Sequence, residues 1–364
     1  MKLLTSGDSH GYGFFAIIEG FPSHFHPDIE RINERLKMRR SVYGRGERMK
    51  IEDDRVSIQS GLWEGETTGA PITFFIPNNS KSPPNDKTTI PRPGHADLDG
   101  MLKYEFDDTR VITERSSARR TVMDVAVGEF ARNALEEIGI KIFGYTKAIG
   151  NVETCQSTPV ELKLSDHPLV CPDFEKEKEM ISKINDAYEG GYTLGGKVVL
   201  IAEGLPPGIG TFDERERRLT SILSSALYDV PSIRGVSFGD AEMISKLRGY
   251  EAVDEIHEKL VRKTNHAGGI EGGMTNGEPI VIELTVKPIS TQKRGVQSID
   301  MKDGSEVETS YVRSDTCVVA AVSIIGPDVL ATALLGELLN EFGGFTFSSF
   351  KRNFELYRRN KNER

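Results

Sequence analysis

Two short segments about half a chain apart have nearly the same sequence. Residues 17–22 read IIEGFP, and residues 201–206 read IAEGLP. Each follows an apolar run typical of a β-strand and precedes turn residues. A match of six residues can arise by chance. It can also mark an internal duplication, and a fold built from two similar halves fits the length of 364 residues.

The hydrophobic spacing predicts a mixture of helices and strands. Apolar residues recur every three to four positions in four segments, which we predict to be helices: residues 121–138, 175–188, 213–228 and 327–342. Three segments rich in Val and Ile predict strands: GKVVLIAEG (196–204), EPIVIELTVKP (278–288) and DTCVVAAVSII (315–325). Helices and strands do not alternate regularly, and no GxGxxG motif follows a strand. The expected fold class is therefore α+β, with layers of helix and sheet, and not a Rossmann fold.

Charge and cysteine content argue against several classes of protein. The net charge of −9 disfavours nucleic-acid binding. The longest apolar runs fall short of the roughly 20 residues of a membrane span, and the N-terminus lacks the features of a signal peptide. The three cysteines, Cys155, Cys171 and Cys317, form no CxxC pair, so neither zinc nor a disulfide framework is indicated. We expect a cytoplasmic protein without a metal site.

Arginine is concentrated in two segments of this acidic chain. RLKMRRSVYGRGERMK covers residues 35–50, and ERSSARR covers residues 114–120. Gly44 and Gly46 predict that the first cluster is a loop displaying guanidinium groups. In the second, Arg115 and Arg119 would share one face at a helix start, where serines could cap the helix or contact an anion. Many charge runs are merely solvated, but a basic pocket in an acidic protein favours a small anionic ligand.

Two histidines stand beside glycines, where few long side chains could crowd them. His10 lies in GDSHG, and His95 lies in RPGHAD. The imidazole pKa near 6.5 lets such a residue donate or accept a proton at neutral pH. The alternative is that each is a turn histidine bonded to the backbone. The glycine-rich stretch HAGGIEGGMTNGEP (266–279) could approach an anion or a planar ring closely, or could simply form tight turns.

Taken together and in order, these motifs resemble the chorismate synthase family. The matching elements are GDSHG, RRSVYGRG, RPGHAD, ERSSAR, NHAGGIEGG, KPIST and RSDTC, and the resemblance spans about residues 1–345. It implies a β-α-β sandwich with internal duplication, with halves near 1–190 and 191–345 and a tail over 346–364. The implied reaction is the 1,4-trans elimination of phosphate from 5-enolpyruvylshikimate 3-phosphate, which gives chorismate in the shikimate pathway. It requires reduced FMN (FMNH2) without net redox change, and family members are usually homotetramers.

The resemblance also implies roles for individual residues. His10 would be the general acid for the departing phosphate, His95 would serve the flavin, Asp315 would accept or pass on a proton, and Ser9 and Ser117 could relay protons. Substrate would be bound by Arg39, Arg45, Arg48, Arg92, Arg119 and Arg313. Flavin would be contacted by Arg115, Ser116, Ser117, Gly272, Lys287, Pro288, Ile289, Ser290, Thr291 and Arg313.

The chain departs from the family pattern at three places, one of which is a short loop, NNSKSPPNDKTTI, before His95. Arg120 stands where the family usually has Glu, and Pro231 and Ser232 stand where a flavin-contacting pair is usual. Two other functions stay open from the residues alone. One is a protein that binds anionic ligands, such as RNA or phosphosugars, without chemistry. The other is an enzyme of the same fold acting on a different phosphorylated enol ether. Nothing in the sequence shows whether NADPH could reduce the flavin on this protein.

Overall fold

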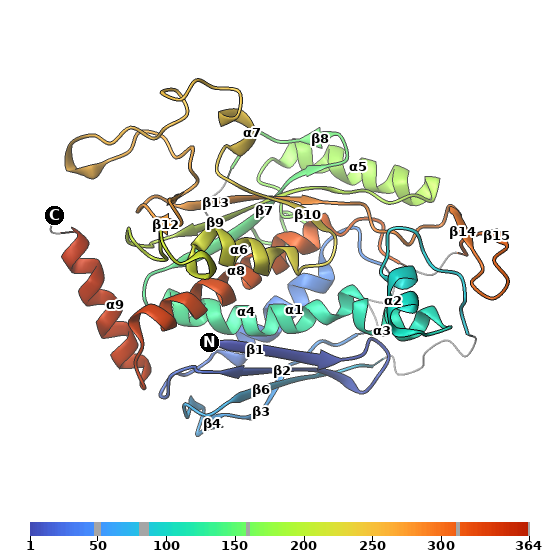
Figure 1. Ribbon diagram of the computed structural model, residues 1–364, viewed down its shortest axis with the longest axis horizontal. Helices are drawn as coiled ribbons and strands as arrows, with labels where there is room; N and C mark the ends of the chain where they lie inside the picture. The colour runs from blue at the N-terminus through green and yellow to red at the C-terminus, as the bar shows by residue number, and fades with distance from the viewer. Residues whose placement is uncertain (47–51, 80–86, 158–160, 311–313, 363–364) are drawn as a thin grey trace.

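The computed structural model describes residues 1–46, 52–79, 87–157, 161–310 and 314–362. Two antiparallel sheets enclose a layer of helices (Figure 1). The first sheet has the strand order β1-β2-β6-β3, with β1 (Lys2–Gly7), β2 (Gly13–Glu19), β6 (Ile72–Pro77) and β3 (Ser57–Ser60). The second has the order β10-β13-β9-β7-β8, with β10 (Ile233–Phe238), β13 (Ile280–Val286), β9 (Gly196–Glu203), β7 (Lys141–Ile149) and β8 (Val152–Glu153).

Four helices fill the space between the sheets: α1 (Ile29–Ser41), α4 (Thr121–Glu136), α6 (Leu219–Tyr228) and α8 (Val319–Phe342). The remaining helices are α2 (Asp97–Tyr104), α3 (Thr109–Ser116), α5 (Phe174–Gly190), α7 (Ala241–Ile244) and α9 (Phe347–Asn362). The part of the chain that the structure describes also has the short 3-10 turns η2 (Ala118–Arg120), η3 (Arg215–Arg217) and η4 (Glu258–Leu260). Small hairpins are formed by β4 (Leu62–Trp63) with β5 (Glu66–Thr67), β11 (Ile270–Glu271) with β12 (Met274–Thr275), and β14 (Gln297–Ile299) with β15 (Glu306–Glu308).

The same arrangement of elements occurs twice along the chain. The strand order β1-β2-β6-β3 of the first sheet is repeated as β7-β9-β13-β10 in the second. In each set a helix (α1 or α6) follows β2 or β9. A small hairpin then precedes β6 or β13, and a long helix (α4 or α8) comes later in the chain. The two sets run over residues 2–136 and 141–342. Residue 190, where the sequence placed the boundary, is the end of α5, between β8 and β9.

The repeated segments IIEGFP and IAEGLP occupy matching positions in these two sets. Strands β2 and β9 both end at the Glu of the segment, and the following glycine has a φ of +80° or +87°. After the turn, Thr67 Oγ1 donates to the carbonyl of Pro22 at 2.7 Å, and Thr275 Oγ1 donates to that of Pro206 at 2.6 Å. Two turns with the same hydrogen bond support the duplication that the short match indicated.

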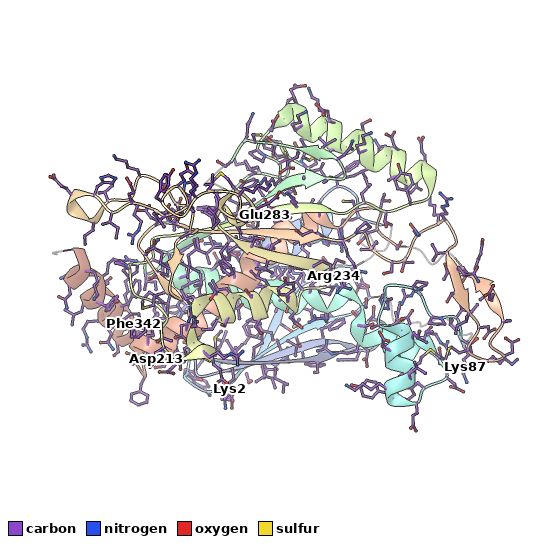
Figure 2. The ribbon with its side chains drawn as sticks, turned by 45° about the horizontal axis from the view of Figure 1, so that its top comes forward. Lys2, Lys87, Asp213, Arg234, Glu283 and Phe342 are labelled. Atoms are coloured by element: carbon purple, nitrogen blue, oxygen red, sulfur yellow. The ribbon has the colours of Figure 1, made fainter. Side chains whose placement is uncertain are left out.

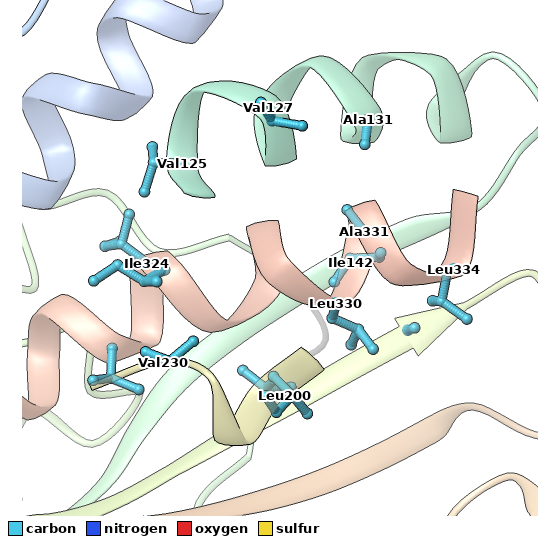
Figure 3. Close-up of a cluster of buried hydrophobic side chains, with 14 of the residues drawn as sticks. Val125, Val127, Ala131, Ile142, Leu200, Val230, Ile324, Leu330, Ala331 and Leu334 are labelled. Atoms are coloured by element: carbon cyan, nitrogen blue, oxygen red, sulfur yellow. The ribbon is translucent and has the colours of Figure 1, made fainter. Parts of the chain in front are cut away.

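The core lies where α4 and α8 cross between the sheets: α4 contacts β2 and β6 of the first sheet, and α8 packs on β7 and β9 of the second sheet. Figure 3 shows side chains from α4, α8 and this sheet in one cluster, including Val125, Ala131, Ile142, Leu200, Ile324 and Leu330. At the crossing, Gly128 of α4 lies against Asp328 of α8, and a Cβ on Gly128 would come 2.3 Å from Asp328 Cβ. This glycine therefore sets how closely the two helices approach.

The N-terminal part of α8 corrects one sequence prediction. Residues 315–325 were expected to form a strand, but helix α8 already begins at Val319 and continues through Pro327. Strand propensity is weak and yields to burial, and residues 319–328 are all buried. A helix that is apolar on all sides is expected inside a core. Among the described residues α8 is long and apolar enough to span a membrane, but 78% of its most apolar window is buried inside the protein.

Three other helix predictions are confirmed with small shifts of their ends. Residues 121–138 and 175–188 correspond to α4 and α5, and residues 213–228 include α6, which begins at Leu219. The C-terminal residues form helix α9, whose Phe350 and Phe354 are fully buried. Phe347 N also donates to the carbonyl of Ser23 at 2.8 Å, so the end of the chain is fastened to the first half.

Candidate active site

A cavity of about 510 Å³ lies where the two halves meet, a size common for small-molecule sites. Both α4 and α8 begin on the side of the molecule that carries α2 and α3 (Figure 1). Phe342, the last residue of α8, lies at the opposite end from Lys87 (Figure 2). The lining residues are Ser9, His10, Arg39, Arg45, Gly46, Arg92, Gly94, His95, Ala96, Thr113, Ser116, Ser117, Ala118, Arg119, Pro231, Ser232, Lys287, Ile289, Ser290, Thr291, Ser314, Asp315 and Val318.

The cavity is bordered by the N-terminal ends of the two long central helices. Ala118 and Arg119 come just before α4, and Val318 is the N-cap of α8. Neither helix has a side-chain hydrogen bond at its N-cap. The first N–H groups of a helix and its macrodipole attract negative charge. Both helices therefore add to the preference of this cavity for an anion.

His10 is held by Glu114, which lies 104 residues further along the chain. Its ring Nδ1 is 2.7 Å from Glu114 Oε1, and its backbone N–H donates to Glu114 Oε2 at 2.7 Å. Ser9 is next to it, and its Oγ donates to Ser117 Oγ at 3.3 Å. The loop after β1 is thus joined to the end of α3, and three of the predicted site residues lie together.

His95 is held in a similar way by Asp97, whose side chain is fully buried. His95 Nδ1 is 2.6 Å from Asp97 Oδ1, and Arg92 Nε donates to Asp97 Oδ2 at 2.7 Å. Thr113 Oγ1 also donates to Asp97 Oδ1, at 3.2 Å. Burial acts to raise the pKa of Asp97, but the hydrogen bonds from His95 and Arg92 outweigh it and hold this pKa below its usual range. One carboxylate therefore orients a histidine and an arginine of the cavity.

Arg39 and Arg119 lie against buried carboxylates beneath the cavity. Arg119 Nη1 is 2.6 Å from Asp54 Oδ1, and Arg39 Nη1 is 3.7 Å from Asp54 Oδ2. Burial and the neighbouring Arg45 lower the pKa of Arg39 to about 9, although Asp54 opposes the shift. The guanidinium groups of Arg39, Arg45 and Arg119 repel one another, and an anion bound among them would reduce this repulsion.

Arg45 and Asp315 form an ion pair close to Arg39. Arg45 Nη1 is 2.9 Å from Asp315 Oδ2, and Gly46 N donates to Asp315 Oδ1 at 2.6 Å. Asp315 lies in the loop before α8 and not at the start of a strand, as the sequence prediction had it.

Pro231 and Ser232 line the cavity at the end of the segment that follows α6. Ser232 has a φ of +78°, a region that residues with a Cβ rarely adopt, and its carbonyl accepts a hydrogen bond from Lys287 N at 2.9 Å. Lys287 Nζ in turn donates to the carbonyl of Gly94 at 2.7 Å, next to His95. Burial and Arg234 lower the pKa of Lys287.

Arg120 faces neither the cavity nor open solvent. It is paired with Asp229 just before this wall: Arg120 Nη1 donates to Asp229 Oδ2 at 2.9 Å, and Nη2 donates to the carbonyl of Asp229. Two of the departures from the family pattern are therefore neighbours, because Asp229 precedes Pro231 by two residues.

Most of the predicted site residues lie around this one cavity, and a few do not. Lining it are Ser9, His10, Arg39, Arg45, Arg92, His95, Ser116, Ser117, Arg119, Lys287, Ile289, Ser290, Thr291 and Asp315. Pro288 and Gly272, which is in the turn between β11 and β12, are not among the lining residues. Arg48 and Arg313 lie outside the described residues.

The local geometry differs from the prediction for both arginine clusters. Arg39 lies on α1, which continues to Ser41, so the predicted loop begins only after this helix. Arg115 and Arg119 do not share a helix face, because α3 ends at Ser116 and η2 follows. Arg115 is exposed and donates to the carbonyl of Thr5 at 3.1 Å, whereas Arg119 is buried. Ser117 does act as a cap, but of η2, where it accepts from Arg119 N at 3.3 Å.

The acidic partners of the site escaped the sequence analysis. Asp54, Asp97 and Glu114 hold the cavity arginines and histidines, and none of them was predicted. A signal was present for two of them, because Asp97 ends the RPGHAD motif and Glu114 begins ERSSAR. Asp54 lies in an ordinary charged run and has no comparable signal.

The fold is a β-α-β sandwich whose cavity gathers arginines and two histidine–carboxylate pairs. The comparisons give the family. The family model described as chorismate synthase matches residues 1–339, and the chain belongs to this family. Chorismate synthase of Thermotoga maritima is 41% identical over 363 residues, covering 98% of this chain and 96% of the relative. That of Carboxydothermus hydrogenoformans is 40% identical over 375 residues, covering 98% of each.

A solved structure of the same family supports the fold assignment. "Crystal Structure of Chorismate Synthase" superposes with a TM-score of 0.82 at 32% identity, covering 100% of this chain and 98% of that one. The predicted class is confirmed: a carbon–oxygen lyase of the shikimate pathway, which supplies aromatic amino acid biosynthesis.

Proposed function

We propose that this cavity converts 5-enolpyruvylshikimate 3-phosphate to chorismate by 1,4-trans elimination of phosphate and a C6 hydrogen. The observation that carries the proposal is the arrangement of Arg39, Arg92 and Arg119 with His10 and His95 around one cavity. The substrate has a phosphate and two carboxylates, which guanidinium groups bind well. Elimination also needs groups that can move protons, and histidine is suited to this at neutral pH.

The residues present fit reduced FMN as the cofactor. Lys287, Ser290 and Thr291 place a cation and two hydroxyl groups on one wall, beside apolar Ile289. The wall is tight at Gly94, where a Cβ would come 3.2 Å from Ser290 Oγ. When bound, reduced FMN supplies electron density to the substrate transiently and recovers it, so no net oxidation occurs. Ser116 and Ser117 would add polar contacts from the opposite side.

Side chains of the protein would transfer the protons of the reaction. The Nδ1 atom of His10 faces Glu114, which leaves Nε2 to donate a proton to the departing phosphate. His95 is oriented by Asp97 at Nδ1, has Arg92 Nη2 at 3.5 Å from its Nε2, and would serve the flavin. Asp315 would accept or pass on the proton lost by the substrate. The contact between Ser9 and Ser117 would allow a short proton relay.

The test is an anaerobic assay with FMN reduced by dithionite. After substrate is added, chorismate and phosphate are followed together. Equal release of both, absent with oxidised FMN, is the expected result. Substrate binding without either product would instead indicate a protein that only binds anionic ligands. Replacing dithionite by NADPH then shows whether the protein can have its flavin reduced by a nicotinamide.

We further propose that the protein is a cytoplasmic homotetramer that binds neither membranes nor nucleic acid. Within the described ranges, Figure 1 draws no helix on the outer face of the first sheet. This face and its loop expose Leu4, Tyr12 and Ile17, whose exposed fractions are 68%, 70% and 36%. A second copy of the chain would cover such an apolar face. All three cysteines are free, as expected in a reducing compartment. Light scattering coupled to size exclusion tests the assembly, with a mass of four chains expected.

A further inference from the structure

The last turn of α3 supports both histidines of the cavity. Glu114 contacts His10 directly, and its neighbour Thr113 contacts Asp97, which holds His95. The Glu114 carboxylate is bidentate toward a single residue, since one oxygen meets the ring Nδ1 of His10 and the other meets its backbone N–H. Two hydrogen bonds of 2.7 Å to one side chain fix both where the imidazole lies and which way it faces.

We propose that Glu114 is the positioning residue for His10, and this rests on the proposed function of His10 as general acid. By accepting from Nδ1–H, the carboxylate selects the ring orientation in which Nε2 is free for the ligand. Without it, the imidazole could rotate about its side-chain bonds, since glycines stand on the nearby positions 7, 11 and 13. Glu114 does not have to touch the ligand, and it is not itself among the residues that line the cavity.

A change at Glu114 leaves the backbone of the loop held by other contacts. The backbone of Ser9 donates to the carbonyl of Glu114 at 3.0 Å, a bond that any residue at position 114 would keep. Asn78 Nδ2 also donates to the carbonyls of Asp8 and Gly11, at 2.8 Å and 3.1 Å. The effect of Glu114→Ala should therefore be confined to the His10 side chain and its N–H group.

The kinetic test is a double-mutant cycle between Glu114 and His10. With reduced FMN, we expect kcat of Glu114→Ala to fall about 10- to 100-fold, by analogy with the loss of partners that orient metal-ligating histidines. The KM for substrate should change less than about threefold. Glu114→Gln keeps an oxygen acceptor and should lose less. In a His10→Ala background, Glu114→Ala should cost no further activity, because its partner is already absent.

Controls and contrary outcomes separate this role from a general structural one. The control is Glu136→Gln. Glu136 is partly exposed, as Glu114 is, and it lies at the last position of α4, where it pairs with Arg31. Its replacement should leave kcat unchanged. An equal loss from Glu114→Ala with and without His10 would overturn the proposal, as would normal kcat in Glu114→Ala.

A second readout does not depend on turnover. ¹⁵N NMR of histidine-labelled protein should show the His10 ring protonated at Nδ1 in the wild type, with its resonance assigned by its loss in His10→Ala. Glu114→Ala should change the balance between the two ring nitrogens. Wild-type protein without lyase activity would refute the proposed function, but this spectrum would still test the positioning role. An unchanged spectrum would refute that role.

Discussion

Gly128 on α4 and Asp328 on α8 touch at the crossing of the two central helices, where a Cβ on Gly128 would come 2.3 Å from Asp328 Cβ and 2.4 Å from its carbonyl oxygen. Neither backbone can yield without moving a helix whose first turn borders the cavity. Gly128→Ala should therefore destabilise the protein by about 1–3 kcal/mol through overpacking. The midpoint of urea unfolding measures this. Gly249→Ala is the matched control, since nothing lies within 4 Å of the added Cβ. Equal midpoints for the two variants would show that the crossing has room.

His10→Ala should lower kcat by about 10²- to 10⁴-fold, the usual contribution of a general acid. Substrate affinity should be nearly unchanged, because the arginines of the cavity are retained. Rapid-quench measurement of phosphate release, together with a substrate titration, separates the two effects. Near-normal turnover in this variant would show that His10 does not protonate the departing phosphate.

Phosphate binding should raise the thermal stability of the protein. Burial, together with repulsion from Arg45 and Arg119, lowers the pKa of Arg39 to about 9, and a bound anion would offset both effects. At 100 times its Kd, a ligand of the native state adds about 2.7 kcal/mol. The stabilisation should shrink as the pH rises from 8 to 10, since Arg39 loses its charge near pH 9. Calorimetry with phosphate against chloride at equal ionic strength measures it. A shift of the same size in Arg39→Met would place the anion elsewhere.

Asp97→Asn should be strongly destabilising, by about 3–5 kcal/mol, because it leaves Arg92 without its buried partner. The pKa of Asp97 lies below its usual range in the folded protein. Its contribution is therefore complete above the unfolded pKa of about 4 and is lost as the pH falls through the folded value. The stability difference between wild type and variant should be constant from pH 7 to pH 5 and shrink on further acidification. Urea unfolding at a series of pH values tests this, and a difference that grew with acid would contradict it.

Arg120→Glu should loosen the cavity wall that contains Pro231 and Ser232, because the new carboxylate would repel Asp229. The expected result is a higher dissociation constant for FMN, by about 3- to 10-fold for the roughly 1 kcal/mol of such a contact. Flavin fluorescence titration measures it. The reciprocal double variant, Arg120→Glu with Asp229→Arg, should recover part of the loss. No recovery would mean that Arg120 acts through some other contact.

Sequence patterns predicted which residues gather at the cavity better than they described its geometry. His10 and His95 stand in glycine-containing motifs that leave them accessible, and both line the cavity. Their partners were harder to find. Glu114 is 104 residues from His10, and Asp54 approaches Arg119 because the segment before β3 lies against η2. Contacts of this kind are set by the tertiary fold and have no local periodicity.

The tertiary fold also explains why residues 315–325 were wrongly predicted to be a strand, although they include the start of α8. Its first residues, rich in Val and Ala, have the composition of a buried strand, and a short apolar run cannot distinguish a strand from a core helix. Pro327 also appeared to mark a helix start, whereas in the fold it lies in the interior of α8 against Gly144. The duplication was easier to find, because its turn depends on a glycine with positive φ in both copies.

The two repeated sets of elements have a consequence for how activity arises. From the first set the cavity takes the loop between β1 and β2, the end of α1 with the segment after it, and segments between β6 and α4. From the second it takes the segment after α6 and segments between β13 and α8. Arg39 and Arg45 stand in one set, while Pro231 and Ser232 occupy the corresponding region of the other. The two repeats share an architecture but contribute different residues to the cavity. The first half supplies most of its charged side chains, and the second half supplies the wall that contains Pro231 and Ser232. Competence is thus a property of the joined pair, and a nascent chain remains inert until its second half has docked.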